Sequence, residues 1–182
     1  AVMALDYAVL LLDGTGGVPA HTVTLFKLLE RYRVPVFFFI NKMDLEGADA
    51  VRAMEAVRSR LTEDAVLIGG PEELGMEGAL AEFVAERDEE VLEAYLEGKL
   101  TREMGLETLQ TLIRQRRAFI AMAGSALRDS GIGEFWQVFD RLTVTDYRPR
   151  ETFSGLVYKV RRDAGGRRIT FIKVEQGTLR TR

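Results

Sequence analysis

The sequence contains no cysteine and a single histidine, His21. The absence of cysteine excludes a disulfide scaffold, a thiolate metal site and a cysteine nucleophile. One histidine cannot supply a metal centre built from paired histidines. No apolar run approaches the roughly 20 residues that are needed to cross a bilayer, so we expect a globular protein with no membrane partner.

The amino-terminal segment is apolar, but it lacks the features of a secretory signal peptide. No basic residue precedes its apolar stretch, and Asp6 interrupts it. We therefore expect a cytoplasmic protein. The chain begins with Ala1 instead of methionine and enters directly into a strand-like pattern, so we also expect it to be part of a longer protein.

The net charge of −3 conceals two regions of opposite sign. Residues 1–147 contain fifteen Lys or Arg against twenty-five Asp or Glu, a net charge of −10, whereas residues 148–182 contain ten against three, a net charge of +7. The second region is too short to enclose a core of its own. The sequence therefore predicts one domain over 1–147 and the beginning of another over 148–182.

Apolar residues in the first region follow two alternating patterns. Continuous runs, typical of strands buried on both faces, occur at Tyr7–Leu12, Val34–Ile40 and Ala118–Met122, and Ala65–Ile68 is expected to form a short strand. Helical spacing is seen in Leu25, Leu28, Leu29 and Tyr32, in Val51, Met54, Val57 and Leu61, from Leu80 to Gly98, and in Phe135, Trp136 and Phe139. The first two sets predict inner helix faces, and Trp136 beside Phe135 is expected in the core. Asp49 can cap the second helix. The alternation predicts an α/β fold, a parallel sheet with helices on both faces.

After Pro149 the pattern changes to two alternating strands. Phe153–Val160 and Arg168–Val174 are joined by Asp-Ala-Gly-Gly at residues 163–166, a sequence typical of a hairpin turn. Two strands do not form a stable domain alone. We therefore predict the opening strands of an antiparallel β-barrel.

The run Val34–Ile40 leads directly into Asn41-Lys42-Met43-Asp44, where a parallel strand presents its carboxyl end. This matches the Asn-Lys-x-Asp guanine-specificity motif of GTPases. Guanine has two adjacent N–H donors, and an ionised Asp44 can accept both at once. Asn41 can bridge neighbouring loops, and the stem of Lys42 can lie along the purine ring. The same residues also occur in ordinary turns, so this motif alone leaves both interpretations open.

A second motif, Gly124-Ser125-Ala126, follows the strand Ala118–Met122. GTPases have a Ser-Ala loop at this place, whose backbone N–H groups face guanine O6 and whose residues are small because the base lies against the backbone. Alone, the tripeptide also fits an ordinary connection. Both motifs together, at two strand ends in this order, favour a guanine-nucleotide site. The residues predicted to form it are Asn41, Lys42, Asp44, Gly124, Ser125 and Ala126.

The chain resembles the translational GTPases of the elongation factor G type, and within them the ribosomal-protection tetracycline-resistance proteins. The matching stretches are residues 5–49, 86–101, 123–135, 153–160 and 167–179. The resemblance implies part of a P-loop-NTPase-like G domain followed by the first strands of a β-barrel domain. It further implies that the protein binds GTP and GDP and that the whole protein hydrolyses GTP. The implied partner is the ribosome, with its rRNA and proteins, and no DNA partner is expected.

The sequence lacks a Gly-x-x-x-x-Gly-Lys-Ser/Thr phosphate-binding loop and its Mg²⁺-binding hydroxyl. The family's Asp-x-x-Gly segment and catalytic histidine would precede Ala1. His21 is not that histidine, and we expect it to be exposed. The chain is thus predicted to hold no catalytic or metal-binding residue, to leave Mg²⁺ to the longer protein, and to be inactive alone.

Two other interpretations remain open at this point. The chain could be a guanine-nucleotide-binding or scaffold module that never hydrolyses GTP, or an unrelated doubly wound domain in which Asn-Lys-Met-Asp arose by chance. The basic runs at residues 114–117 and 161–168 could contact RNA, but paired arginines are also common on exposed turns.

Overall fold

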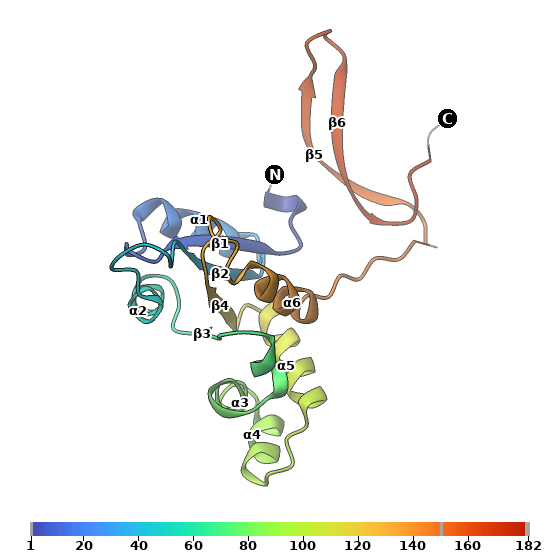
Figure 1. Cartoon of the computed structure of the whole chain (residues 1–182). Coiled ribbons are helices and arrows are strands. Elements are labelled where there is room, and N and C mark those ends of the chain that lie inside the picture. Colours follow the sequence, from blue (N-terminus) through green and yellow to red (C-terminus); the bar gives the residue numbers. More distant parts are fainter. Residues whose placement is uncertain (1, 150, 181–182) are drawn as a thin grey trace. The chain divides into compact units, whose positions relative to one another are not determined.

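Four strands pair side by side as one parallel sheet (Figure 1). They are β1 (Ala8–Asp13), β2 (Val36–Asn41), β3 (Ala65–Leu67) and β4 (Phe119–Ala123), in the order β1-β2-β4-β3. This computed structural model describes residues 2–149 and 151–180. The predicted parallel α/β sheet is confirmed.

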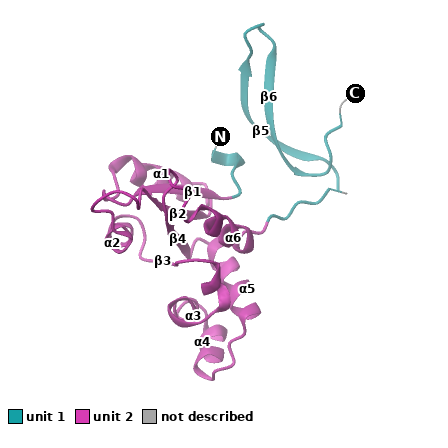
Figure 2. Ribbon diagram, in the orientation of Figure 1, with its two compact units in different colours: residues 1–6, 145–182 teal, residues 7–144 magenta. Residues whose placement is uncertain are grey.

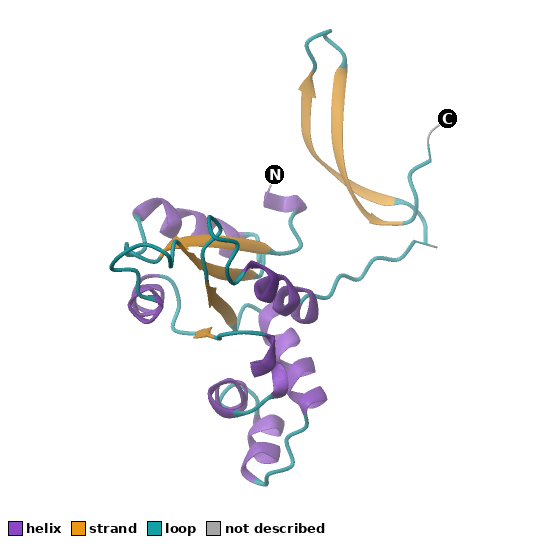
Figure 3. Ribbon diagram, viewed as in Figure 1, coloured by secondary structure: helices purple, strands orange, loops and turns teal. Residues whose placement is uncertain are grey.

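Helices connect these strands (Figure 3). They are α1 (Ala20–Arg31), α2 (Ala50–Arg60), α3 (Gly78–Ala85), α4 (Glu89–Leu96), α5 (Arg102–Arg114) and α6 (Ile132–Leu142), with short 3-10 helices η1 (Val2–Ala4) and η2 (Pro71–Gly75). Asp49 caps α2 as predicted, because its carboxylate accepts hydrogen bonds from two backbone N–H groups of the first turn. The periodic segment from Leu80 to Gly98 forms two helices, α3 and α4. The second begins after Asp88, whose side chain accepts a hydrogen bond from Val91 N.

The central strand β2 is buried from Val36 to Ile40, and its side chains alternate between two helical layers. The Phe38 ring lies 6.0 Å from that of Phe26 on α1, whereas the Phe39 ring lies 5.3 Å from that of Phe135 on α6. Helices therefore cover both faces of the sheet, as predicted.

The prediction that the first strand is buried on both faces is wrong. Leu10 and Leu12 are buried, but Leu11 between them is 65% exposed. Within the described residues β1 pairs with β2 alone and so forms the edge of the sheet. An apolar run indicates a strand, but the sheet order decides how many of its faces are covered.

The predicted inner face of α1 is also wrong in part. Leu25, Leu28 and Tyr32 are exposed, and of the four predicted residues only Leu29 is buried, together with Phe26. The Phe26 ring packs on two rings of the sheet, those of Phe38 and Phe119, which turns the helix away from the predicted orientation. Similarly, Val51 at the start of α2 is exposed.

The chain divides into two compact units (Figure 2): Tyr7–Val144, and Ala1–Asp6 together with Thr145–Arg182. In the second unit, β5 (Ser154–Arg162) and β6 (Arg168–Gln176) pair antiparallel, which confirms the predicted hairpin. The predicted domain division at 147/148 stays a prediction, and residues 150, 181 and 182 lie outside the described residues.

Candidate functional site

The carboxyl ends of β1, β2 and β4 meet at one edge of the sheet. Asp13 at the end of β1 is in register with Asn41 at the end of β2, and Ile40 is in register with Ala123 of β4. The loops that follow β2 and β4 therefore start side by side. This is the edge where open α/β sheets bind ligands.

Asn41 joins these two loops. Its Oδ1 accepts one hydrogen bond from the backbone N of Lys42 (2.8 Å) and another from the backbone N of Ala126 (2.9 Å). Backbone bonds reinforce the connection, since Met43 N donates to Gly124 O (3.1 Å). The bridging role predicted for Asn41 thus has a contact that spans 85 positions of the chain.

Asp44 and Ser125 form the second link between the loops. Ser125 Oγ donates to Asp44 Oδ1 at 2.5 Å, and Ser125 is only 3% exposed. The hydrogen bond from Ser125 holds the pKa of the Asp44 carboxyl below its usual range, with a weaker contribution from Arg128. Asp44 is therefore ionised at neutral pH, and its second oxygen lies 3.9 Å from Arg128 Nε. A carboxylate in this state can accept further N–H donors.

Lys42 is held by a residue that the sequence reasoning missed. Its Nζ lies 2.6 Å from Asp13 Oδ2, and its backbone has a φ of 66°. Asp13 Oδ1 in turn accepts from Thr15 N (2.9 Å) and Thr15 Oγ1 (2.7 Å). The hydrogen bond from Lys42, followed by those from Thr15, holds the pKa of Asp13 far below its usual range. The sequence signal that could have identified Asp13 is its position, since it is a polar residue at the carboxyl end of the first predicted strand.

Gly124 is required by the packing of its own loop. A Cβ at this position would clash with Ser130 O and would lie 2.9 Å from Phe39 Cζ. The small residues of this loop were predicted to make room for the base, but the contacts with Ser130 and Phe39 require a glycine even without a ligand. Ala126 is exposed at the outer end of the same loop.

Two further predictions concern single residues. His21 is exposed, as expected. Trp136 was expected in the core, but it is 55% exposed because α6 buries Phe135, Val138 and Leu142 instead. The rings of Trp136 and Phe135 pack edge to face, with their centroids 5.7 Å apart.

Neither a metal cluster nor a membrane-spanning helix is found in the described part of the chain. Over residues 2–149 and 151–180, no group of three or more His, Cys, Asp or Glu side chains is arranged to hold a metal ion. None of the helices in these ranges combines the length and the apolar character that crossing a membrane demands.

Comparisons with known proteins identify relatives along the whole chain. Residues 1–145 match the family model of the elongation factor Tu GTP binding domain. The chain is 27% identical over 192 residues to the tetracycline resistance protein TetM from transposon Tn5251 of Streptococcus pneumoniae. It is 29% identical over 196 residues to the tetracycline resistance protein TetW of Butyrivibrio fibrisolvens. Each alignment covers 100% of this chain and 30% of the relative.

The fold is similar to that of a solved structure, ttk003000868 from Thermus thermophilus. The TM-score is 0.77 at 19% identity, and the match covers 97% of this chain and 32% of that chain. At this identity the likeness concerns the fold, and it extends through both units of the chain. The chain thus spans about a third of the length of the proteins that it matches.

Proposed function

Because this chain belongs to the family of the elongation factor Tu GTP-binding domain, we propose that the loops following β2 and β4 hold the guanine base of GTP or GDP. Asp44 accepts the two N–H donors of guanine, and Asn41 keeps the two loops together. The backbone of Gly124–Ala126 faces guanine O6. The observation that carries this proposal is the Ser125–Asp44 hydrogen bond of 2.5 Å, which fixes an ionised carboxylate at the carboxyl edge of the sheet.

Lys42 has a positioning role in this proposal. Its ammonium is engaged by Asp13, so its methylene stem is anchored at both ends and can lie along the purine ring. An anchored stem loses less conformational freedom when a base binds than a free one would.

For the whole protein we propose GTP hydrolysis on the ribosome, in the manner of the elongation factor G type, with rRNA and ribosomal proteins as partners and the cytoplasm as its location. The two tetracycline resistance proteins support this proposal through similarity along the whole chain. Their similarity also makes ribosomal protection against tetracycline the activity to be tested first.

Mg²⁺ does not fit the residues of this chain. The 182 residues contain no Gly-x-x-x-x-Gly-Lys-Ser/Thr sequence, and the described residues hold no metal-binding cluster. Phosphoryl transfer depends almost wholly on groups that position and neutralise the phosphates. We therefore propose that Mg²⁺ and the phosphates are bound by other parts of the whole protein.

The 182-residue chain alone is accordingly expected to hydrolyse GTP no faster than buffer. Phosphate release would be measured with and without Mg²⁺ over several hours. Magnesium-dependent turnover that copurifies with the chain through successive columns would contradict this expectation. A whole protein that binds GDP and also shows no turnover on ribosomes would instead identify a guanine-nucleotide-binding module.

Replacing Asp44 tests the base-reading site directly. In Asp44→Asn an amide N–H faces an N–H of guanine, whereas xanthine presents a carbonyl there. Each charge-assisted hydrogen bond contributes roughly 1.5–3 kcal/mol, so GDP affinity should fall by about tenfold or more. Xanthosine diphosphate should bind more tightly than it does to the wild type. Titration calorimetry with GDP, xanthosine diphosphate and ADP would measure these changes in the whole protein.

The matched control is Asp129→Asn. Asp129 belongs to the same loop as Ser125, is exposed, and has a φ of 53° that asparagine tolerates. This variant should bind GDP as the wild type does. Unchanged GDP affinity in Asp44→Asn would show that Asp44 does not touch the base.

A further inference from the structure

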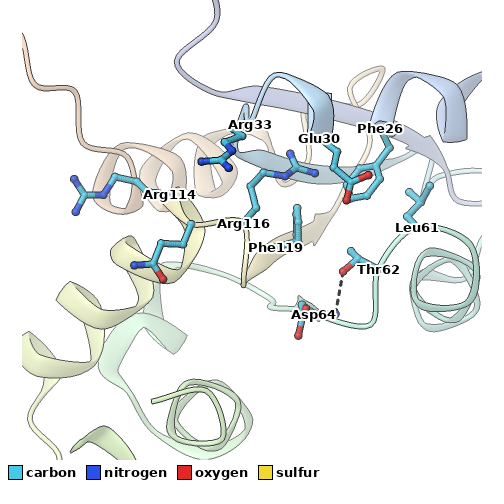
Figure 4. A pocket seen from close by; sticks show the side chains of 10 residues that line it. Phe26, Glu30, Arg33, Leu61, Thr62, Asp64, Arg114, Arg116 and Phe119 are labelled. Carbon is cyan, nitrogen blue, oxygen red and sulfur yellow. Dashed lines mark hydrogen bonds between the residues drawn. The ribbon is translucent and has the colours of Figure 1, made fainter. Parts of the chain in front are cut away.

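A cavity of about 680 Å³ opens in the same unit, lined by residues that the proposed nucleotide site does not use (Figure 4). Its walls come from the carboxyl end of α1, the segment that follows α2 and the segment between α5 and β4, and they include Phe26, Leu61 and Phe119. Phe119 is the first residue of β4, whereas the nucleotide loops follow the strand's last residue. The cavity therefore lies at the amino end of the strand, and its volume is within the range typical of small-molecule sites.

Arginine dominates the charge of this cavity. Arg33, Arg114 and Arg116 line it, and among the described residues none of them has a carboxylate within ion-pair distance. Of the two lining carboxylates, Asp64 is already paired with Arg87 at 3.1 Å. The cavity thus carries excess positive charge.

Arg116 is the least solvated of the three arginines. It is half-buried, and its guanidinium lies 5.1 Å from the centre of the Phe26 ring and 5.2 Å from that of Phe119. Burial lowers the pKa of Arg116, and the charge of Glu30 opposes that change. Figure 4 shows the Arg116 guanidinium on the Glu30 side of the cavity, with Arg114 extending away from it. A guanidinium remains charged in such a place, so an anion beside it would be favoured.

The backbone also places arginines where glycine is the usual residue. Arg33 follows the end of α1 with a φ of 54°, and Arg116 follows the end of α5 with a φ of 60°. Each lies just before a backbone bond that closes its helix, Val34 N to Leu29 O and Arg117 N to Leu112 O. Such left-handed positions favour glycine, yet both carry arginines that line the same cavity.

We propose that this cavity binds a small organic phosphate, with the phosphate held by Arg33 and Arg116 and the organic part against Leu61 and the edge of Phe26. A phosphate offers three terminal oxygens, which suits guanidinium groups that come from two different loops. Thr62 and Glu30 supply hydrogen-bond acceptors for a hydroxyl or amine of the same ligand.

Phenyl phosphate is the probe for this site. Titration into isotope-labelled protein would follow the arginine Nε–H signals and yield a dissociation constant, expected near or below about 1 mM. Benzyl alcohol, which has the ring but no phosphate, should not bind. Inorganic phosphate should bind the same arginines more weakly, since it lacks the organic part.

Two variants locate the binding. Arg33→Met should weaken phenyl phosphate by about tenfold, the loss expected for one charge-assisted contact, while thermal unfolding stays unchanged because Arg33 is exposed. Arg116→Met should weaken it further, although its guanidinium also donates to Val34 O, so its fold must be checked. The matched control is Arg31→Met, an exposed arginine of α1 that does not line the cavity and should bind normally.

Several outcomes would overturn the proposal. The proposal fails if Arg33→Met binds phenyl phosphate as tightly as the wild type, or if benzyl alcohol binds as tightly as phenyl phosphate. Arg33 and Arg116 would then serve only to stabilise the carboxyl ends of their helices. Displacement of phenyl phosphate by GDP, or its loss in Asp44→Asn, would assign it to the nucleotide site. Binding of a single-stranded RNA through Arg33, without binding of phenyl phosphate, would identify a nucleic-acid surface instead.

Discussion

Strands β2 and β5 differ in composition and in surroundings: five of the six residues of β2 are apolar, against four of the nine residues of β5. All apolar residues of β2 are buried, whereas Val157 and Val160 of β5 are 51% and 54% exposed. β2 has a strand on each side and a helical layer on each face, while in the described residues of its unit β5 pairs with β6 alone. Even the apolar residues of a strand are therefore buried only where other strands and helices cover them.

Amide exchange should show the largest difference between these two regions. The amides of β2 should exchange only when the unit opens globally, whereas those of β5 should exchange through local opening of the hairpin. With a stability of roughly 5 kcal/mol or more, at about 1.4 kcal/mol per factor of ten, this predicts exchange that is at least about 1,000-fold slower in β2. Exchange followed by mass spectrometry or NMR would measure it. Equal protection would mean that the hairpin is covered in solution by a further layer.

The same layers determine what the sequence could predict. The apolar run at Val34–Ile40 and the helical spacing around Met54 and Val57 identified a buried strand and a buried helix face correctly. Leu11 and Leu25 were misjudged because their exposure depends on which strand is at the edge and how α1 is rotated. Both facts arise from tertiary packing, which a local pattern does not contain.

In the candidate site, too, the local sequence pattern predicted some contacts, and tertiary packing decided others. The strand ends predicted that the loops of Asn41 and Gly124 would meet, and they do. The contact between Asp13 and Lys42 was not predicted, because nothing in the local pattern pairs two residues that are 29 positions apart. Trp136 was misplaced because it adjoins Phe135 in sequence and only the helix orientation separates them.

Alanine replacements of one glycine in each unit should differ in their effect on the stability of the Tyr7–Val144 unit. In Gly124→Ala the new Cβ meets Ser130 O and Phe39, so the Tyr7–Val144 unit should lose about 1–3 kcal/mol of stability. Gly155→Ala in β5 also places a Cβ close to backbone, 2.9 Å from Lys173 O, but should leave the unfolding of the Tyr7–Val144 unit unchanged. Urea denaturation followed by Trp136 fluorescence reports on this sheet-containing unit.

The control for these replacements is Gly133→Ala. Gly133 lies within α6 and a Cβ there meets nothing within 4 Å. Alanine in a helix should stabilise the unit by about 0.5–1 kcal/mol. If Gly124→Ala also proves neutral, the loop after β4 adjusts freely, and its packing against Ser130 does not fix the shape of the site.

The carboxylates of Asp13, at the end of β1, and Asp163, in the hairpin turn, give the smallest expected difference, which depends on pH. Asp13 reaches across the sheet edge to Lys42, whereas Asp163 accepts hydrogen bonds only within its own turn, from Gly165 N and Arg167 N at 2.9 Å each. The pKa of both carboxyls is lowered, that of Asp13 chiefly by Lys42 and that of Asp163 chiefly by the backbone of Arg167.

A carboxyl whose pKa is lower in the folded than in the unfolded state stabilises the fold at any pH above its unfolded value of about 4, and this stabilisation disappears as the pH falls toward the folded value. Asp13→Asn should therefore cost the sheet-containing unit a constant amount between about pH 7 and pH 5, and progressively less below about pH 4. The amount is small, about 0.5 kcal/mol, because both members of the pair are largely solvated.

Asp163→Asn should not shift the unfolding of that unit at any pH, since its partners all belong to the hairpin. Urea denaturation from about pH 7 to pH 3, followed by Trp136 fluorescence, would measure both variants across this range. A difference between wild type and Asp13→Asn that grows as the pH falls would reverse the predicted sign, and would show that Lys42 is held by something other than the charge of Asp13.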